Sequence, residues 1–172
     1  MYPKYSPLST LFSLFLLFTA CAGTTEKPIP SEHTTSSQKQ ISTKGAEYRA
    51  QWRDDYNYNT PVLIDSFRKW QDFLAAHPGN FTRPDSATEH YSRSFFQDSV
   101  VYAYLKSESS GANQLRIEKV RLEGDTLKLY MENIIPQMGT MDMATRVCFF
   151  GISRDVMDKA EEVEAVIIRK EG

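Results

Sequence analysis

Hydrophobic and polar residues alternate over much of the second half of the chain, a pattern typical of β-strands with one buried face. The clearest case is residues 126–133, where Leu127, Leu129 and Met131 share one face and polar side chains share the other. Two other segments are apolar on both faces, which predicts central strands covered on both sides. These two segments are residues 100–105 and 146–153, and further strands are expected at 48–52, 62–64, 115–122 and 163–168.

The segments 115–122 and 126–133 are expected to pair as a hairpin. They are joined by Gly124-Asp125, and Gly at the first central position suits a type II′ turn. The apolar positions of the first segment change parity near Glu118-Lys119. Because side chains alternate strictly along a strand, this change predicts a β-bulge there.

Residues 66–77 have the helical period instead. Phe67, Trp70, Phe73 and Leu74 recur at spacings of three and four, and Asp65 or Ser66 can cap the first turn. Pro78-Gly79 then ends the helix. Several antiparallel strands and one amphipathic helix predict an α+β fold, a single β-rich, sandwich-like domain over residues 46–172 that is covered by the helix.

The first twenty residues have the pattern of an export signal. One cation, Lys4, precedes an apolar segment at 8–20 that is too short to span a membrane, and small residues stand directly before Cys21. The segment resembles the lipobox of bacterial lipoproteins, which implies cleavage before Cys21 and a diacylglycerol on its thiol. The alternative is an ordinary secretory signal with Cys21 incidental.

Residues 21–45 are rich in Thr, Ser, Pro, Gln and Lys and have few large apolar residues. Such a segment cannot offset the entropy of ordering, so we expect a disordered tether. Two acyl chains on Cys21 would anchor the protein stably to a membrane. The lipoprotein resemblance therefore implies the cell envelope, and Ala22 favours the outer membrane if the bacterium has two membranes.

Charge and sequence motifs exclude several kinds of function. With 20 basic against 22 acidic residues and no basic tract, the chain has no footprint for nucleic acid. No nucleophile motif, zinc spacing or phosphate loop is present, so no catalytic residue, metal or cofactor is predicted. The segment 107–111 is interpreted as a turn, the calcium-like segment 55–59 as a polar turn, and Cys148 as a buried apolar side chain.

Residues 136–144, between two predicted strands, combine turn-forming residues with three methionines. Some of them would shape the loop and satisfy its amides, namely Pro136, Gly139, Thr140 and Asp142. Met138 and Met141 could instead form an adaptable surface for a partner. The structural interpretation of the loop is favoured, and the contact interpretation is kept as its alternative.

Residues 60–153 resemble a group of exported bacterial proteins and the C-terminal domain of the PrcB family, lipoprotein subunits that stabilise a surface protease complex. The resemblance is carried by Tyr91 to Phe96, Val100-Val101, Ser109 to Gly111, the hairpin 117–132 and the loop 136–144. It implies the fold and no catalytic residues. Residues 154–172 depart from the short ending of that family.

These observations predict a lipid-anchored envelope protein that acts as a non-catalytic binding or accessory module. Its partners would be the membrane, through the lipid on Cys21, and a protein of unknown identity, such as a protease that it stabilises. The alternatives are a ligand-binding or hydrolytic envelope lipoprotein, which would need a deep pocket with convergent polar groups, and a purely structural envelope protein.

Overall fold

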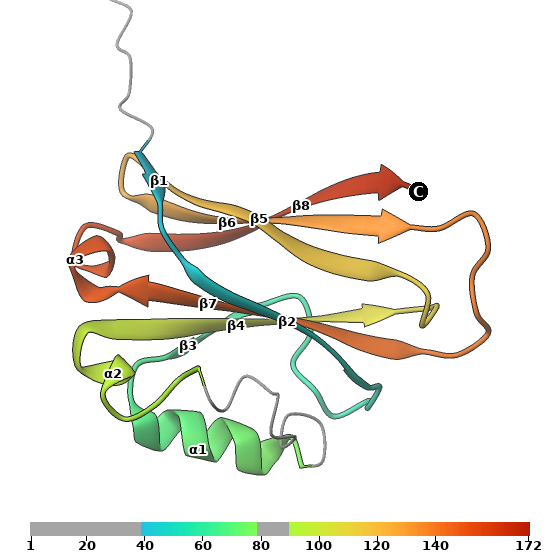
Figure 1. The fold of residues 1–172 in the computed structure, drawn as a ribbon, viewed down its shortest axis with the longest axis horizontal. Coiled ribbons are helices and arrows are strands. Elements are labelled where there is room, and N and C mark those ends of the chain that lie inside the picture. The colour runs from blue at the N-terminus through green and yellow to red at the C-terminus, as the bar shows by residue number, and fades with distance from the viewer. Residues whose placement is uncertain (1–38, 79–89) are drawn as a thin grey trace, which may run out of the picture. The chain divides into compact units, whose positions relative to one another are not determined.

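The computed structural model describes residues 39–78 and 90–172. They form two four-stranded sheets, with strand orders β1-β5-β6-β8 and β2-β7-β4-β3 (Figure 1). The strands are β1 (Lys39–Ile41), β2 (Lys44–Gln51), β3 (Pro61–Ile64), β4 (Ser99–Glu108), β5 (Gln114–Glu123), β6 (Thr126–Ile135), β7 (Ala144–Ser153) and β8 (Glu162–Glu171). The helices are α1 (Phe67–Ala76), α2 (Phe95–Asp98) and α3 (Arg154–Met157). The predicted β-rich, sandwich-like fold with a covering helix is confirmed.

The sheet β2-β7-β4-β3 is the middle layer, with the other sheet on one face and α1 on the other (Figure 1). Its central strands β4 and β7 are therefore buried on both faces, as their apolar sequences predict. Tyr102, Tyr104, Cys148 and Phe150 face the core between the sheets. The core under α1 contains Ile64, Trp70, Tyr91, Phe96, Val101, Ala103, Leu105, Val147 and Phe149.

Helix α1 begins and ends where the sequence predicts. The Ser66 hydroxyl accepts a hydrogen bond from the Lys69 amide at 3.3 Å, which satisfies one of the free donors of the first turn. His77 follows the last helical residue and leaves the helical conformation directly before Pro78. Trp70 is the fully buried residue of the helix, and Phe67, Phe73 and Leu74 pack beside it at the edge of the core.

The hairpin β5–β6 also matches the prediction. Leu127, Leu129 and Met131 are buried between the sheets, and the pairing of the strands shifts between Ile117 and Lys119, which confirms the bulge. Gly124 has a φ of 66°, whereas Asp125 does not have a positive φ, and this combination is that of a type II′ turn.

The last strand is the exception to the antiparallel pairing predicted for the fold. β8 pairs with β6 in parallel, from Thr126 opposite Glu162 to Ile135 opposite Glu171. The chain leaves β7 in one sheet, turns through α3 and enters the other sheet at its edge. Strand periodicity specifies which face is buried but not the direction of the neighbouring strand, so the sequence could not show this.

The N-terminal boundary of the domain lies earlier than predicted. Residues 39–45 were expected in the tether, yet they form β1 and the start of β2, and Ile41 is buried opposite Val120. An edge strand needs few apolar residues, so its composition resembles that of a tether. Helix α2 was also not predicted. Its buried residue is Phe96, which packs in the core under α1.

The signal segment, Cys21 and most of the predicted tether lie outside the described residues. Within residues 39–78 and 90–172, no helix has both the length and the apolar character needed to cross a membrane. Cys148 is fully buried, as predicted, and burial raises the pKa of its thiol.

Candidate functional site

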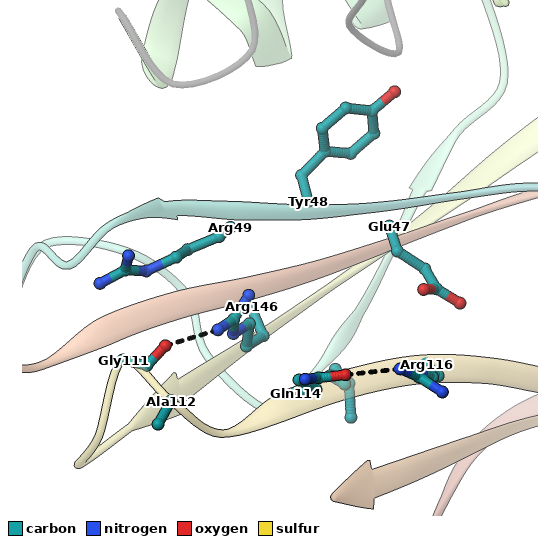
Figure 2. A pocket seen from close by; sticks show the side chains of 9 residues that line it. Glu47, Tyr48, Arg49, Gly111, Ala112, Gln114, Arg116 and Arg146 are labelled. Atoms are coloured by element: carbon teal, nitrogen blue, oxygen red, sulfur yellow. Dashed lines mark hydrogen bonds between the residues drawn. The ribbon is translucent and has the colours of Figure 1, made fainter. Parts of the chain in front are cut away.

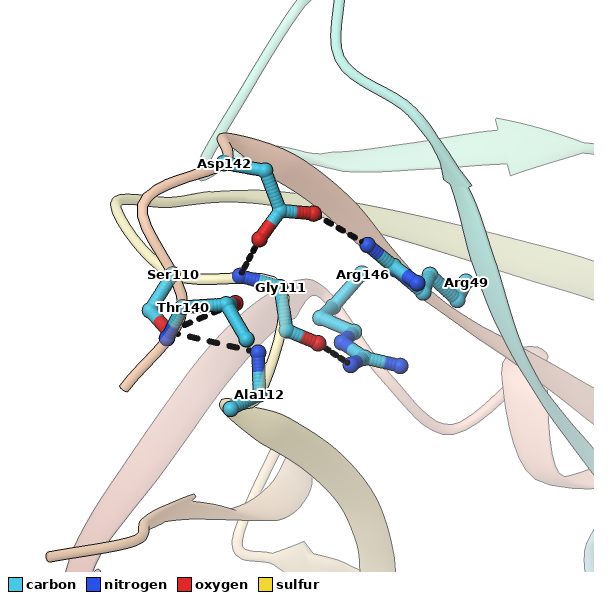
Figure 3. A network of polar contacts seen from close by, with 7 residues as sticks. All are labelled: Arg49, Ser110, Gly111, Ala112, Thr140, Asp142 and Arg146. Atoms are coloured by element: carbon cyan, nitrogen blue, oxygen red, sulfur yellow. Dashed lines mark hydrogen bonds and ion pairs between the residues drawn. The ribbon is translucent and has the colours of Figure 1, made fainter. Parts of the chain in front are cut away.

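Two loops meet at one end of the sandwich and are joined by hydrogen bonds (Figure 3). They are the β4–β5 loop, residues 109–113, and the β6–β7 loop, residues 136–143. The buried Ser110 hydroxyl accepts hydrogen bonds from the Thr140 amide at 2.8 Å and the Ala112 amide at 3.2 Å, and it also contacts the Thr140 hydroxyl at 3.2 Å. One side chain thus fixes both loops.

Asp142 makes the second connection between the loops. One carboxylate oxygen accepts a hydrogen bond from the Gly111 amide at 3.3 Å, and the other lies 2.5 Å from the Arg49 guanidinium on β2. The Arg146 guanidinium of β7 donates to the Gly111 carbonyl at 2.7 Å. A Cβ atom on Gly111 would lie 2.3 Å from Asp142 Oδ2 and 2.4 Å from the Arg49 guanidinium, so a larger residue at this position would displace the ends of these two side chains.

The β4–β5 loop rests on buried polar groups of its own. The Asn113 side-chain amide donates to Glu108 at 2.7 Å, and Lys106 pairs with the other oxygen of that carboxylate at 2.5 Å. Glu108 and Asn113 are both buried. A buried carboxylate that is paired and hydrogen-bonded on both oxygens holds the loop in one conformation.

The methionines of the β6–β7 loop point into solvent. Met138 is 85% exposed and Met141 is fully exposed, while Met143 is half exposed. Pro136 follows the end of β6, and a Cβ atom on Gly139 would approach the Ser110 hydroxyl to 3.0 Å. The structure therefore brings Gly139, Thr140 and Asp142 against residues 110–112 and leaves Met138 and Met141 outside this network.

Other candidates from the sequence have ordinary structural positions. Ser107 accepts a hydrogen bond from the Trp52 indole at 2.9 Å, and Asp55 pairs with Arg53 at 2.7 Å. Asn59 has a φ of 60° in a turn. His33 lies outside the described residues. Within those residues, no group of three His, Cys, Asp or Glu side chains is placed to hold a metal ion.

The loop contacts make the ionised form of Asp142 favourable. The Thr140 hydroxyl, the Gly111 amide and the Arg49 charge hold the pKa of this carboxyl below its ordinary value of 3.8, although partial desolvation opposes them. Because the folded-state pKa is lowered, the stabilisation is fully present above pH 3.8 and is lost as the pH falls through the lowered value.

We therefore expect Asp142→Asn to melt below the wild-type protein by a margin that depends on pH. The difference in Tm should be constant above about pH 5 and should shrink on further acidification, because the wild-type carboxylate then becomes protonated. Thermal unfolding followed by circular dichroism at several pH values measures this margin. A margin that stays the same down to about pH 2 would contradict this account of Asp142.

Sequence reasoning located the β6–β7 loop and named Gly139, Thr140 and Asp142 in it, but not the residues outside the loop that hold it. Ser110 and Gly111 stood in a segment interpreted only as a turn, and the signal that could have found them is a short Ser-Gly pair before an apolar strand. Arg49 and Arg146 lie 93 and 35 residues from their partners Asp142 and Gly111. Nothing local in the sequence indicates those pairings.

Comparison with known proteins finds no match for the chain among protein families, curated proteins or solved structures.

Proposed function

We propose that this protein is a non-catalytic contact module of the bacterial cell envelope, held at a membrane by lipid on Cys21, that binds a protein partner through the β6–β7 loop. One observation carries the proposal: Met138 and Met141 are exposed on a loop that Ser110 and Asp142 hold in place. Stabilisation of a partner such as a protease is the role that the PrcB-like sequence features favour.

The rigid support of the loop favours binding for an energetic reason. Ordering a flexible loop on association reduces affinity, whereas a loop already held in its bound conformation avoids that loss. The methionine side chains remain adaptable, because an unbranched thioether can fit irregular apolar surfaces. The loop thus combines a fixed backbone with side chains that can adjust to a partner.

Replacing Met138 and Met141 together with Ser is expected to abolish partner capture and leave the fold intact. Surface substitutions of this kind usually change stability by less than about 0.5 kcal/mol. Crosslinking in intact envelopes, followed by purification and quantitative mass spectrometry, would identify the partner and measure its loss. Leu63→Ser is the matched control, because Leu63 is a 41% exposed apolar residue on β3, outside the β6–β7 loop.

Two results would count against this function. A partner that crosslinks equally to the double variant and to the Leu63 control does not use the loop. The purified protein could instead turn over a substrate and lose that activity when one polar residue is substituted. This result would favour the hydrolytic alternative over the contact module.

The anchoring proposal has its own test. Cys21→Ser should remove the thiol that carries the diacylglycerol, so the protein should lose both processing before residue 21 and its lipid mass. Membrane fractionation and intact-mass measurement of wild-type and variant protein give the answer. An unmodified Cys21 in mature wild-type protein would show that the segment is an ordinary secretory signal.

A further inference from the structure

A hollow of about 330 Å³ lies between β2 and β5, beside the joined loops (Figure 2). β2 is an edge strand, and β1 pairs only with residues 120–122 of β5. Within the described part of the chain, residues 114–119 of β5 therefore have no strand beside them on this side. The hollow opens where the edges of the two sheets separate.

Three arginines from three strands line this hollow. Arg49 comes from β2, Arg146 from β7 and Arg116 from β5, and Figure 2 shows the first two near Gly111 and the third beside Gln114. Two carboxylates stand near them. Glu47 accepts a hydrogen bond from the Ile117 amide at 2.7 Å, and Asp142 pairs with Arg49.

Glu108 near Arg146 and Glu132 opposite Arg116 are themselves paired with Lys106 and Lys170. The three guanidinium groups therefore face two other carboxylates, and one positive charge is not compensated. Arg116 donates to the neutral Gln114 side chain at 2.7 Å, and among the described residues neither Arg116 nor Arg146 forms an ion pair with a carboxylate. Protein surfaces usually pair or separate such charges, because like charges close together repel each other.

The unbalanced positive charge is least favourable at Arg146, because this side chain is partly buried. Its guanidinium donates to the Gly111 carbonyl, while its Nε is buried and has no hydrogen-bond partner among the described residues. Burial, and then the nearby Arg49 charge, lower the pKa of Arg146. Glu108 and Asp142 act against this shift, but neither forms an ion pair with Arg146 in the described part of the chain. A partly desolvated cation without an ion-pair partner is unfavourable, and an anion bound in the hollow would offset that cost.

We propose that this hollow is a binding site for a carboxylate, with Arg116 and Arg146 as the residues that attract it. A single uncompensated charge matches a monovalent anion, and the planar guanidinium presents parallel donors that fit the two oxygens of a carboxylate. The volume is in the range of small-ligand sites. The inference stands on the hollow alone and does not depend on a partner at the β6–β7 loop.

The test uses the full chain and three probes in isothermal titration calorimetry. They are an N-acetylated trialanine with a free C-terminal carboxylate, the same peptide as its C-terminal amide, and propionate. We expect saturable binding of a carboxylate with a Kd of about 1 mM or tighter, and none of the amide. Binding of the peptide acid alone assigns the carboxylate to a peptide terminus, and equal binding of propionate assigns it to a small free acid.

Arg116→Gln is the main variant, because Arg116 is exposed and its one described contact is with Gln114, so its loss should leave the fold intact. The Kd for the carboxylate should rise about tenfold, because the variant lacks one charge-assisted hydrogen bond to it. Arg146→Gln should raise the Kd at least as much. Arg68→Gln, the same charge change on exposed α1 surface, should bind as wild type. The site is disproved if no carboxylate binds, if the amide binds equally, or if Arg116→Gln matches the Arg68 control.

Discussion

Truncation of Trp70 to Ala is expected to lower the free energy of unfolding by about 3–5 kcal/mol. Trp70 is 1% exposed under α1, and its ring centroid lies 5.2 Å from those of both Tyr91 and Phe149 in edge-on geometry. The substitution removes these aromatic contacts and leaves a cavity between the helix and the sheet. Urea denaturation followed by circular dichroism measures the change.

Trp52→Ala is the matched control for Trp70, because Trp52 is half-buried and contributes a hydrogen bond to Ser107. Its truncation should lower the free energy of unfolding by about 1–2 kcal/mol, because partial burial and one hydrogen bond are lost. If the two tryptophan variants lose equal stability, α1 does not form the packed layer described here.

Truncation of Leu129 to Ala is expected to cost about 2–5 kcal/mol in the other core. Leu129 has no exposed surface, and it lies between the sheets with Val120 opposite it on β5. It belongs to the same core cluster as the residues on the inner face of β4 and β7, two strands that α1 covers from the other side. Chemical denaturation should show a lower midpoint with an unchanged slope.

Leu63→Ala serves as the comparison for Leu129, since the same atoms are removed from a 41% exposed position on edge strand β3. It should cost less than about 1 kcal/mol. Equal losses for the two leucines would show that Leu129 is not in the core and that the register of the hairpin is wrong.

The features that the sequence predicted correctly are those determined by neighbouring residues. The hairpin depends on the alternation around Leu127 and Leu129, on Gly124 in the turn and on a parity change that only a bulge can explain. The helix depends on the spacing of Trp70 and its neighbours and on Ser66 as a cap. Each signal is complete within about a dozen residues.

The features that the sequence did not predict depend on residues far apart in the chain. The parallel pairing of β8 with β6 and the position of β1 beside β5 depend on how the chain crosses between the sheets. The same holds for the site. The loop 136–144 was identified from its own residues. Arg49 and Arg146 lie beside it only because β2 and β7 pair with each other, and that pairing could not be predicted from the sequence.

The position of β8 at the edge of its sheet also affects the behaviour of the protein at high concentration. Among the described residues no strand pairs with its outer side, so the backbone groups there could pair with another chain, and its apolar centre, Ala165 to Ile168, has the composition of an aggregation-prone segment. Charged residues stand on both sides of that centre: Glu162, Glu164, Arg169, Lys170 and Glu171. They act as gatekeepers, because stacking identical strands in register would bring like charges together. A high local concentration would favour such stacking, and these five residues oppose it.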